Sequence, residues 1–362
     1  MDFTKTEAQR DLAGLTRDIV AKHSTNDVGR QLDSDTGSID RALWEAIRSA
    51  GLLTATAPES IGGDGYGVLE STSIAIELGR GLAAVPFVAS STAAAAIDRF
   101  GTEELQRDWA TPAIDGTKIL TLALDEEQGD PLDPLTRAVR TDTGWTVAGA
   151  KTAVDSAPVA DAFLVTSTDG VFLLQSDDPG VNITTQLGVD NRSLGSIEVE
   201  CTAPESARLA DPDATRWILA RATLGTCAYQ VGVLEESLRV TAEYARERVQ
   251  FGKPIGSFQA VAQRLADAYI DVKGARLTLW KAAWSLSAGH PSDEEVAVAK
   301  FWAADAGHRV AHTLVHIHGG VGLDRDHPVH RYFLAAKRAE FAYGSATAQL
   351  RRLGASLAAV PA

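Results

Sequence analysis

Residues 244–255 read Tyr-Ala-Arg-Glu-Arg-Val-Gln-Phe-Gly-Lys-Pro-Ile, and this stretch closes a long helical pattern. Apolar residues recur on one face over 217–246, and the Gly and Pro that follow predict the end of the helix. Arg248 and Gln250 can project from such an end, and the planar fork of an arginine suits a phosphate. Phe251 can then lie against an adenine or ribose. A solvated basic helix end with Phe251 in the core is an equally simple alternative.

A second stretch, residues 316–322, reads His-Ile-His-Gly-Gly-Val-Gly and ends another helical pattern over 294–318. Paired glycines after a helix let the backbone approach a ligand closely and expose amide donors to it. The second stretch therefore favours the binding interpretation of the first.

The pattern of apolar residues along the chain predicts three parts: a helical domain over 1–117, a β domain over 118–210 and a helical bundle over 211–362. Helical spacing marks further segments, which are Ala42–Ser49, Leu69–Leu82, Phe258–His290 and Tyr332–Ala359. Short β-branched and apolar runs separated by Asp-Gly, Pro-Gly and Thr-Gly turns predict a small antiparallel barrel or sandwich. These runs are Lys118–Leu124, Trp145–Ala148, Ala162–Ser167, Gly170–Gln175, Val181–Thr185 and Ser196–Cys201.

Composition excludes several classes of function. A net charge of −14 argues against nucleic acid, whose binding rests on cationic contacts with phosphates. No apolar run reaches the length of a membrane span, and the first residues lack the pattern of a signal peptide. The two cysteines, Cys201 and Cys227, have no metal or disulfide spacing, so we expect a cytoplasmic protein.

Three other patterns suggest sites but have simpler explanations. His308, His312 and His316 can share a helix face, but no carboxylate or cysteine accompanies them as in a zinc site, so we expect polar packing and no metal. The Asp-Thr-Gly triplets at 35–37 and 142–144 lack the preceding apolar strand of an aspartic protease, and we interpret them as turns. The glycine-rich segment 57–65 lacks the Lys-Ser/Thr of a P-loop and also predicts a turn.

The two C-terminal stretches resemble the acyl-CoA dehydrogenase superfamily, and the resemblance covers nearly the whole chain. It extends to the Pro-Glu-x-x-Gly-Gly loop at 58–63, to Glu-Leu-Gly-Arg at 77–80 and to Gly-x-Lys at 149–151. The resemblance implies a mainly α fold with a central β domain: an N-terminal helical domain, a middle β-barrel and a C-terminal four-helix bundle. It also implies FAD as cofactor, held at its phosphate and adenine end by Arg248, Gln250, Phe251, His316, Gly319 and Gly320.

The departures from the family pattern are as informative as the matches. The family's catalytic glutamate precedes a Gly-Thr/Ser pair, and Tyr343 stands at that place. The alternative base position falls near Thr215. Residues 124–127 read Leu-Asp-Glu-Glu where the family has a flavin-binding Thr-Glu-Pro segment, and 153–155 read Ala-Val-Asp where it has an aromatic residue against the flavin. Other acids follow along the helix, and we expect solvated charges there rather than displaced bases: Glu235, Glu236, Glu243 and Glu247.

A chain that keeps the cofactor grip but has no catalytic residue of its own resembles the β subunits of actinobacterial heterotetrameric acyl-CoA dehydrogenases. Those enzymes act on steroid side chains of the 3-oxocholest-4-en-26-oyl-CoA type. The resemblance implies an α2β2 assembly, one FAD shared with an α subunit that supplies the base, and an electron-transfer acceptor. Two alternatives stay open at this point: a homomeric dehydrogenase with a displaced glutamate, and a structural subunit that binds no cofactor.

Overall fold

A computed structural model describes residues 4–35, 37–190 and 192–359 of the chain. Contacts group these residues into two compact units. The first, called here the bundle unit, comprises the chain up to Gly29, Val68–Ala83 and the chain from Thr223 onward. The second, the sheet unit, comprises Arg30–Gly67 and Ala84–Ala222. The division into three domains at residues 117 and 210 stays a prediction.

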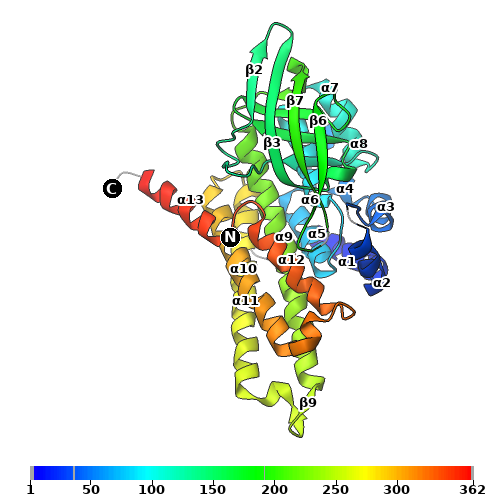
Figure 1. Cartoon of the computed structure of the whole chain (residues 1–362), viewed down its shortest axis with the longest axis vertical. Helices are drawn as coiled ribbons and strands as arrows, with labels where there is room; N and C mark the ends of the chain where they lie inside the picture. The colour runs from blue at the N-terminus through cyan, green and yellow to red at the C-terminus, as the bar shows by residue number, and fades with distance from the viewer. Residues whose placement is uncertain (1–3, 36, 191, 360–362) are drawn as a thin grey trace. The chain divides into compact units, whose positions relative to one another are not determined.

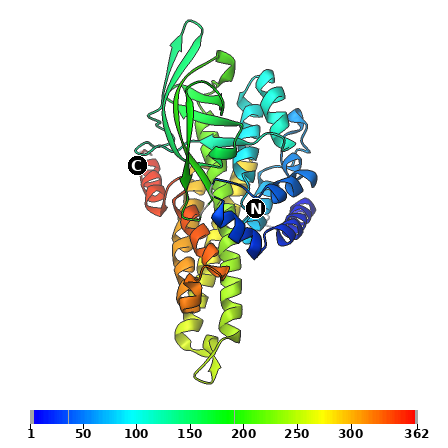
Figure 2. The same cartoon turned by 45° about the vertical axis from the view of Figure 1, so that its right-hand side comes forward.

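The bundle unit is built on long helices that lie side by side in both views, with a short β-hairpin at one end (Figures 1 and 2). The helices predicted over 69–82, 217–246, 258–290 and 294–318 are present and begin and end close to the predicted residues. In chain order the elements are α1 (Glu7–His23), α5 (Val68–Arg80), α9 (Ala214–Glu247), β9 (Val249–Gln250), β10 (Lys253–Pro254), α10 (Gln259–Ser287), α11 (Asp293–His318), α12 (Val329–Phe341) and α13 (Ala346–Ala359). The first turns of α9 belong to the sheet unit.

The last predicted helix, 332–359, is two helices, so that prediction was wrong. Tyr343 and Gly344 adopt left-handed backbone angles, with φ of 55° and 100°, and a right-handed helix cannot continue through them. The side chain of Gln349 is buried and stabilises this break. Its amide nitrogen donates to the carbonyls of Tyr343 and Gly344 at 3.0 and 3.4 Å.

Helices α5 and α9 cross with their backbones in contact. A Cβ placed on Gly79 would lie 1.9 Å from the carbonyl oxygen of Tyr229, and one on Gly232 would lie 1.9 Å from that of Ile76. No side chain fits in either place, so each helix needs its glycine. The crossing explains the Gly of the Glu-Leu-Gly-Arg stretch by packing.

The sheet unit holds two four-stranded sheets, in the strand orders β1-β4-β5-β8 and β2-β3-β7-β6. All strand pairs are antiparallel except β1 and β4, which are parallel. This parallel pair differs from the predicted antiparallel barrel or sandwich. The strands are β1 (Leu120–Ala123), β2 (Arg137–Thr141), β3 (Gly144–Asp155), β4 (Ala162–Ser167), β5 (Gly170–Gln175), β6 (Val181–Leu187), β7 (Ser193–Ala203) and β8 (Arg208–Leu209). The pattern found six of these and missed β2 and β8, which are short and carry arginines.

Helices complete the sheet unit, and the fold class is the expected one: helical first and last parts around a β region. These helices are α2 (Asn26–Ser34), which begins in the bundle unit, α3 (Arg41–Ser49), α4 (Leu52–Ala55), α6 (Phe87–Phe100), α7 (Glu103–Leu105) and α8 (Thr111–Ile114). In the part of the chain that the structure describes, no helix combines the length and apolar character needed to cross a membrane.

The segments interpreted as turns have backbone reasons for their glycines. Asp142 and Thr143 form the β2–β3 turn, and Gly144 opens β3 with a φ of 149°. In the loop at 57–65, a Cβ on Gly63 would lie 2.2 Å from the carbonyl oxygen of Ala57. The first Asp-Thr-Gly triplet includes Thr36, which lies outside the described residues.

Gly232→Ala tests the α5–α9 crossing. The added methyl group meets a backbone carbonyl that cannot move alone, so we expect the free energy of unfolding to fall by about 2 kcal/mol or more. The matched control is Gly354→Ala on α13, where a Cβ meets nothing within 4 Å. There the better helix propensity of alanine should raise stability by up to about 1 kcal/mol. Urea midpoints measure both, and equal shifts in the two variants would contradict the close crossing.

Candidate cofactor-binding site

The stretch that closes α9 forms a tight hairpin exposed to solvent. Gln250 pairs with Lys253, and the turn between them places Phe251 and Gly252 at φ of 52° and 77°. Phe251 is 92% exposed, and its ring meets that of Phe258 edge to face, with the ring centroids 6.2 Å apart. The alternative that Phe251 plugs the core is therefore wrong.

Arg248 joins the hairpin through its backbone and leaves its side chain available. Its N–H donates to Tyr244 and its carbonyl accepts from Ile255, both at 2.8 Å. Its guanidinium has no hydrogen bond or ion pair with the residues that the structure describes. The Gln250 amide donates to the carbonyl of Val249 within the hairpin, at 2.8 Å. An exposed cationic fork on a fixed backbone can take a phosphate from outside the chain.

The second stretch ends α11 with open backbone. His316, Gly319 and Gly320 are exposed, and Gly319 has a φ of 61°. A Cβ on either glycine would meet nothing within 4 Å. Packing inside this chain therefore gives no reason for Gly320, whereas close approach of a ligand does. These residues fit the phosphate-bearing end of FAD.

A stacked pair holds the two stretches at the same end of the bundle unit. The ring of His318 lies on that of Tyr244 with the centroids 4.3 Å apart and the planes 22° apart. Burial lowers the pKa of His318, and its Nδ1 lies 2.9 Å from the carbonyl oxygen of Leu314. The neutral ring therefore donates Nδ1–H to that carbonyl. The sequence placed both residues inside the quoted stretches but did not predict the stack.

The six residues predicted to bind the cofactor are brought to one end of the bundle unit. All six are exposed, three on the hairpin after α9 and three at the end of α11. The set supplies a guanidinium, an amide, a ring and open backbone amides, which can bind and orient a nucleotide. Their assignment to FAD stays a prediction.

In the sheet unit, the segment that replaces the family's flavin-binding segment forms an ion pair and hydrogen bonds within the chain. Glu126 and Lys151 are an ion pair at 2.6 Å, and their side chains are 5% and 0% exposed. Glu126 also accepts from the hydroxyl of Thr136 at 2.7 Å, and Lys151 donates to Thr166 at 2.9 Å. The polar groups at 126 and 151 are thus satisfied within the chain.

The neighbouring strand bulges where the family has its aromatic residue. The register of β3 against β7 shifts between Lys151 and Val154, and Ala153 takes a left-handed φ of 52°. The N–H of Ala153 donates to the side chain of Gln186 at 3.2 Å. A methyl group stands there in place of a ring, so this strand offers a flavin no stacking surface at that position.

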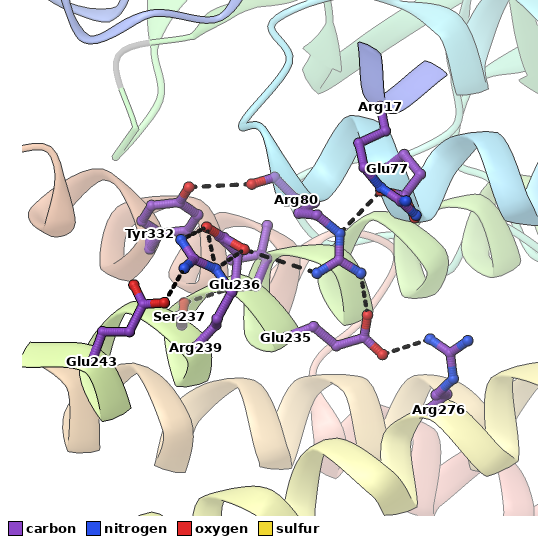
Figure 3. A network of polar contacts seen from close by, with 11 residues as sticks. Arg17, Glu77, Arg80, Glu235, Glu236, Ser237, Arg239, Glu243, Arg276 and Tyr332 are labelled. Carbon is purple, nitrogen blue, oxygen red and sulfur yellow. Dashed lines mark hydrogen bonds and ion pairs between the residues drawn. The ribbon is translucent and has the colours of Figure 1, made fainter. Parts of the chain in front are cut away.

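The acids of α9 were expected to be solvated, and for two of them this was wrong. Glu235 and Glu236 are 18% and 13% exposed and belong to an ion-pair network on Arg80 (Figure 3). Glu235 lies 2.5 Å from both Arg80 and Arg276. Glu236 lies 2.5 Å from Arg239, which also binds the more exposed Glu243 at 2.7 Å. A carboxylate held by two cations is a poor base, because the cations lower its proton affinity.

The same network ties α1 and α12 to the helix crossing. Glu77 on α5 is 4% exposed and pairs with Arg80 at 3.0 Å and with Arg17 of α1 at 2.9 Å. Tyr332 of α12 donates its hydroxyl to the backbone carbonyl of Arg80 at 3.2 Å (Figure 3). Both carboxylates that Arg80 contacts at 2.5–3.0 Å, Glu77 and Glu235, thus have a second arginine partner.

Neither family base position carries a carboxylate. Tyr343 lies half-buried in the break between α12 and α13, and Thr215 lies half-buried in the first turn of α9. The histidines of α11 pack as polar side chains: His308 contacts Lys337 and Glu340, and its ring centroid is 4.4 Å from that of His312. Across the described residues, no cluster of three or more potential metal ligands forms.

Comparison with known proteins identifies the family. Residues 6–117 match the model of the acyl-CoA dehydrogenase N-terminal domain, and 213–358 match that of the C-terminal domain. Acyl-CoA dehydrogenase FadE27 of Mycobacterium tuberculosis is 51% identical over 376 residues, covering 100% of both chains. This chain belongs to the acyl-CoA dehydrogenase family. Its members are oxidoreductases that act on CH–CH groups.

Solved structures of two heteromeric complexes are similar over nearly the whole chain. A chain of the ChsE4–ChsE5 complex from Mycobacterium tuberculosis matches with a TM-score of 0.96 and 51% identity, covering 100% of both chains. A chain of the Tcur3481–Tcur3483 steroid acyl-CoA dehydrogenase, in its G363A variant, matches with a TM-score of 0.92 and 38% identity, covering 97% of this chain and 98% of that one.

Glu77→Gln tests the network through its pH dependence. Burial alone would raise the pKa of Glu77, but the ion pairs with Arg17 and Arg80 outweigh it and hold the pKa below its ordinary value. This stabilisation is present at neutral pH and is lost as the pH falls below about 4.5, the ordinary pKa of a glutamate. The variant should lose about 3 kcal/mol of unfolding free energy at pH 7, and the gap to wild type should shrink on acidification.

The control for this variant is Glu45→Gln, which removes an exposed pair with Arg48. We expect no measurable change there, because water screens such pairs. Urea unfolding between pH 3 and pH 7 measures both variants. A gap between Glu77→Gln and wild type that stays constant over this range would mean that Glu77 does not act through its charge.

Proposed function

We propose that this chain is the β subunit of a heteromeric FAD-dependent acyl-CoA dehydrogenase that introduces an α,β double bond into a steroid side-chain CoA thioester. One combination supports the proposal: the chain presents an exposed guanidinium and open backbone amides that suit a phosphate, and Tyr343 stands where the family has its base. The paired acids of α9 support it, because their cationic partners oppose the displaced-glutamate alternative.

Each chain then has a separate role in the reaction. A carboxylate of the α subunit would remove the α proton of the thioester, and bound FAD would supply the acceptor for the β hydrogen as hydride. Arg248 and Gln250 would hold the pyrophosphate of the shared FAD, and Phe251 would lie at its adenosine. His316, Gly319 and Gly320 line the same end. The contribution of this chain is to bind and orient the cofactor.

Similarity to two solved complexes supports the proposed substrate class and assembly. The matched Tcur3481–Tcur3483 protein is described as a steroid acyl-CoA dehydrogenase, and ChsE4–ChsE5 is a complex of two chains. We infer an α2β2 heterotetramer in the cytoplasm that acts on a thioester of the 3-oxocholest-4-en-26-oyl-CoA type and passes electrons to a separate acceptor.

Co-expression with a candidate α chain, an acyl-CoA dehydrogenase that keeps the glutamate, tests the proposal. This chain alone should hold little FAD and show no turnover, because it lacks the base and the flavin contacts of the sheet unit. The co-purified complex should be yellow, with one FAD for each pair of chains. FAD absorbance, protein mass and turnover of a steroid acyl-CoA measure this. Turnover by this chain alone, or a stable complex in which this chain changes neither FAD content nor affinity, would refute the proposal.

Arg248→Ala tests the grip within the complex. A charged hydrogen bond to phosphate contributes about 1.5–3 kcal/mol, so the Kd for FAD should rise by at least about tenfold. The subunits should stay together. The control is Arg246→Ala, two residues earlier on α9, where the guanidinium is 75% exposed and lies 3.9 Å from Glu243. Retention of FAD on dilution, measured by fluorescence, should fall only in the Arg248→Ala variant. Equal retention in both variants would mean that Arg248 is not part of the FAD site.

A further inference from the structure

Arg221, in the sheet unit, has no acidic partner among the residues that the structure describes. It lies half-buried in the first turns of α9, with its guanidinium carbon 3.6 Å from the ring centroid of Trp217. Its side chain has no hydrogen bond or ion pair with any residue in the described ranges. Burial and the positive charge of Arg99 lower the pKa of Arg221 to about 10. A second cation, not an anion, is therefore its charged neighbour.

Arg99 reaches this place from the end of α6. It is exposed, and its guanidinium carbon lies 5.3 Å from the ring centroid of Phe100. The ring of Phe100 meets that of Trp217 at 90°, with the centroids 5.6 Å apart. The adjacent carboxylate of Asp98 accepts from the hydroxyl of Ser60 at 2.5 Å. The two arginines thus meet beside two aromatic rings, and we call this group the arginine pair.

The missing counter-charge does not reflect a shortage of acidic residues. The chain has 48 acidic and 34 basic residues, so carboxylates are not scarce. Arg239 and Arg309 are paired with carboxylates that raise their pKa values. The closest analogue in the sheet unit is Arg208, whose guanidinium carbon lies 4.5 Å from the ring centroid of Trp145. It has Glu205 at 3.7 Å. A stacked arginine in this fold is therefore compatible with a carboxylate, and Arg221 lacks one.

We propose that Arg99 and Arg221 form a binding site for a phosphate monoester, with Trp217 and Phe100 beside it. Such a group carries about −1.5 to −2 charges at pH 7 and three acceptor oxygens. It can neutralise two guanidinium groups, whereas one carboxylate neutralises only one. The planar fork of arginine also matches phosphate geometry.

Two sources share this chemistry. One is the 3′-phosphate of CoA, which rests on the proposed function because that function makes a CoA thioester the substrate. The nearby rings suit the adenine of such a ligand. The other is free inorganic phosphate.

Calorimetric titration of the full chain with CoA, dephospho-CoA and inorganic phosphate tests the site and separates the sources. If the 3′-phosphate is the ligand, CoA should bind at least about tenfold more tightly than dephospho-CoA and than inorganic phosphate. If free phosphate is the ligand, it should bind as tightly as CoA. In either case Arg221→Gln and Arg99→Gln should each raise the Kd by about tenfold or more. Because Arg99 is exposed, its variant tests the site even if Arg221→Gln does not fold.

Two controls locate the binding. Arg140→Gln removes a 72% exposed arginine that lies over Trp145 but has Glu205 at 3.7 Å, and it should leave the Kd unchanged. Arg246→Ala, which removes a 75% exposed arginine on the bundle-unit part of α9, should also leave it unchanged. No binding by the wild-type chain, or an unchanged Kd in both arginine-pair variants, would overturn the proposal. These titrations need no partner subunit. A negative titration would therefore not change the FAD count expected for the complex, and an unexpected FAD count would not change the titration result.

Discussion

The crossing of α5 and α9 is the constraint on which the bundle unit depends. Gly79 and Gly232 bring the two backbones into contact, and no side chain can separate them. Arg80 follows directly and is held against α9, where Glu235 receives it. Buried charges need partners, and the network on Arg80 supplies them from α1, α5, α9 and α10. The close backbone contacts at the two glycines thus bring these charged side chains together.

The position of α9 then determines where the predicted cofactor-binding residues lie. The helix runs on to Tyr244, whose ring stacks on His318 at the end of α11. That stack holds the hairpin and the glycine turn at the same end of the bundle unit, with their functional groups facing outward. Exposed residues of this kind can complete a site only with a ligand or a partner that comes to them. The arrangement agrees with a subunit that binds part of a shared cofactor.

The acidic side chains that could act as catalytic bases form structural ion pairs instead. The acids of α9 hold arginines, and Glu126 holds Lys151 inside the sheet unit. The position of the family's base has a tyrosine in a helix break that Gln349 stabilises. A carboxylate with two cationic partners cannot easily take a proton, because protonation would leave the cations uncompensated. The family membership and the missing base are both explained if the proton acceptor belongs to another chain.

The sequence by itself determined most of the long helices, six of the strands and the lack of a glutamate at position 343, and it predicted the two cofactor stretches. These depend on local periodicity, on turn chemistry or on the identity of one residue. Only the tertiary structure decided that Phe251 is exposed, that Glu235 and Glu236 are paired, that the last helix breaks, and that Arg221 has no acidic partner. Each of these depends on groups distant in sequence, such as Arg80 with Glu235 or Arg99 with Arg221. A local sequence pattern does not specify which distant side chains the fold brings together. In a buried region, those pairings decide which side chains stay charged and which can react.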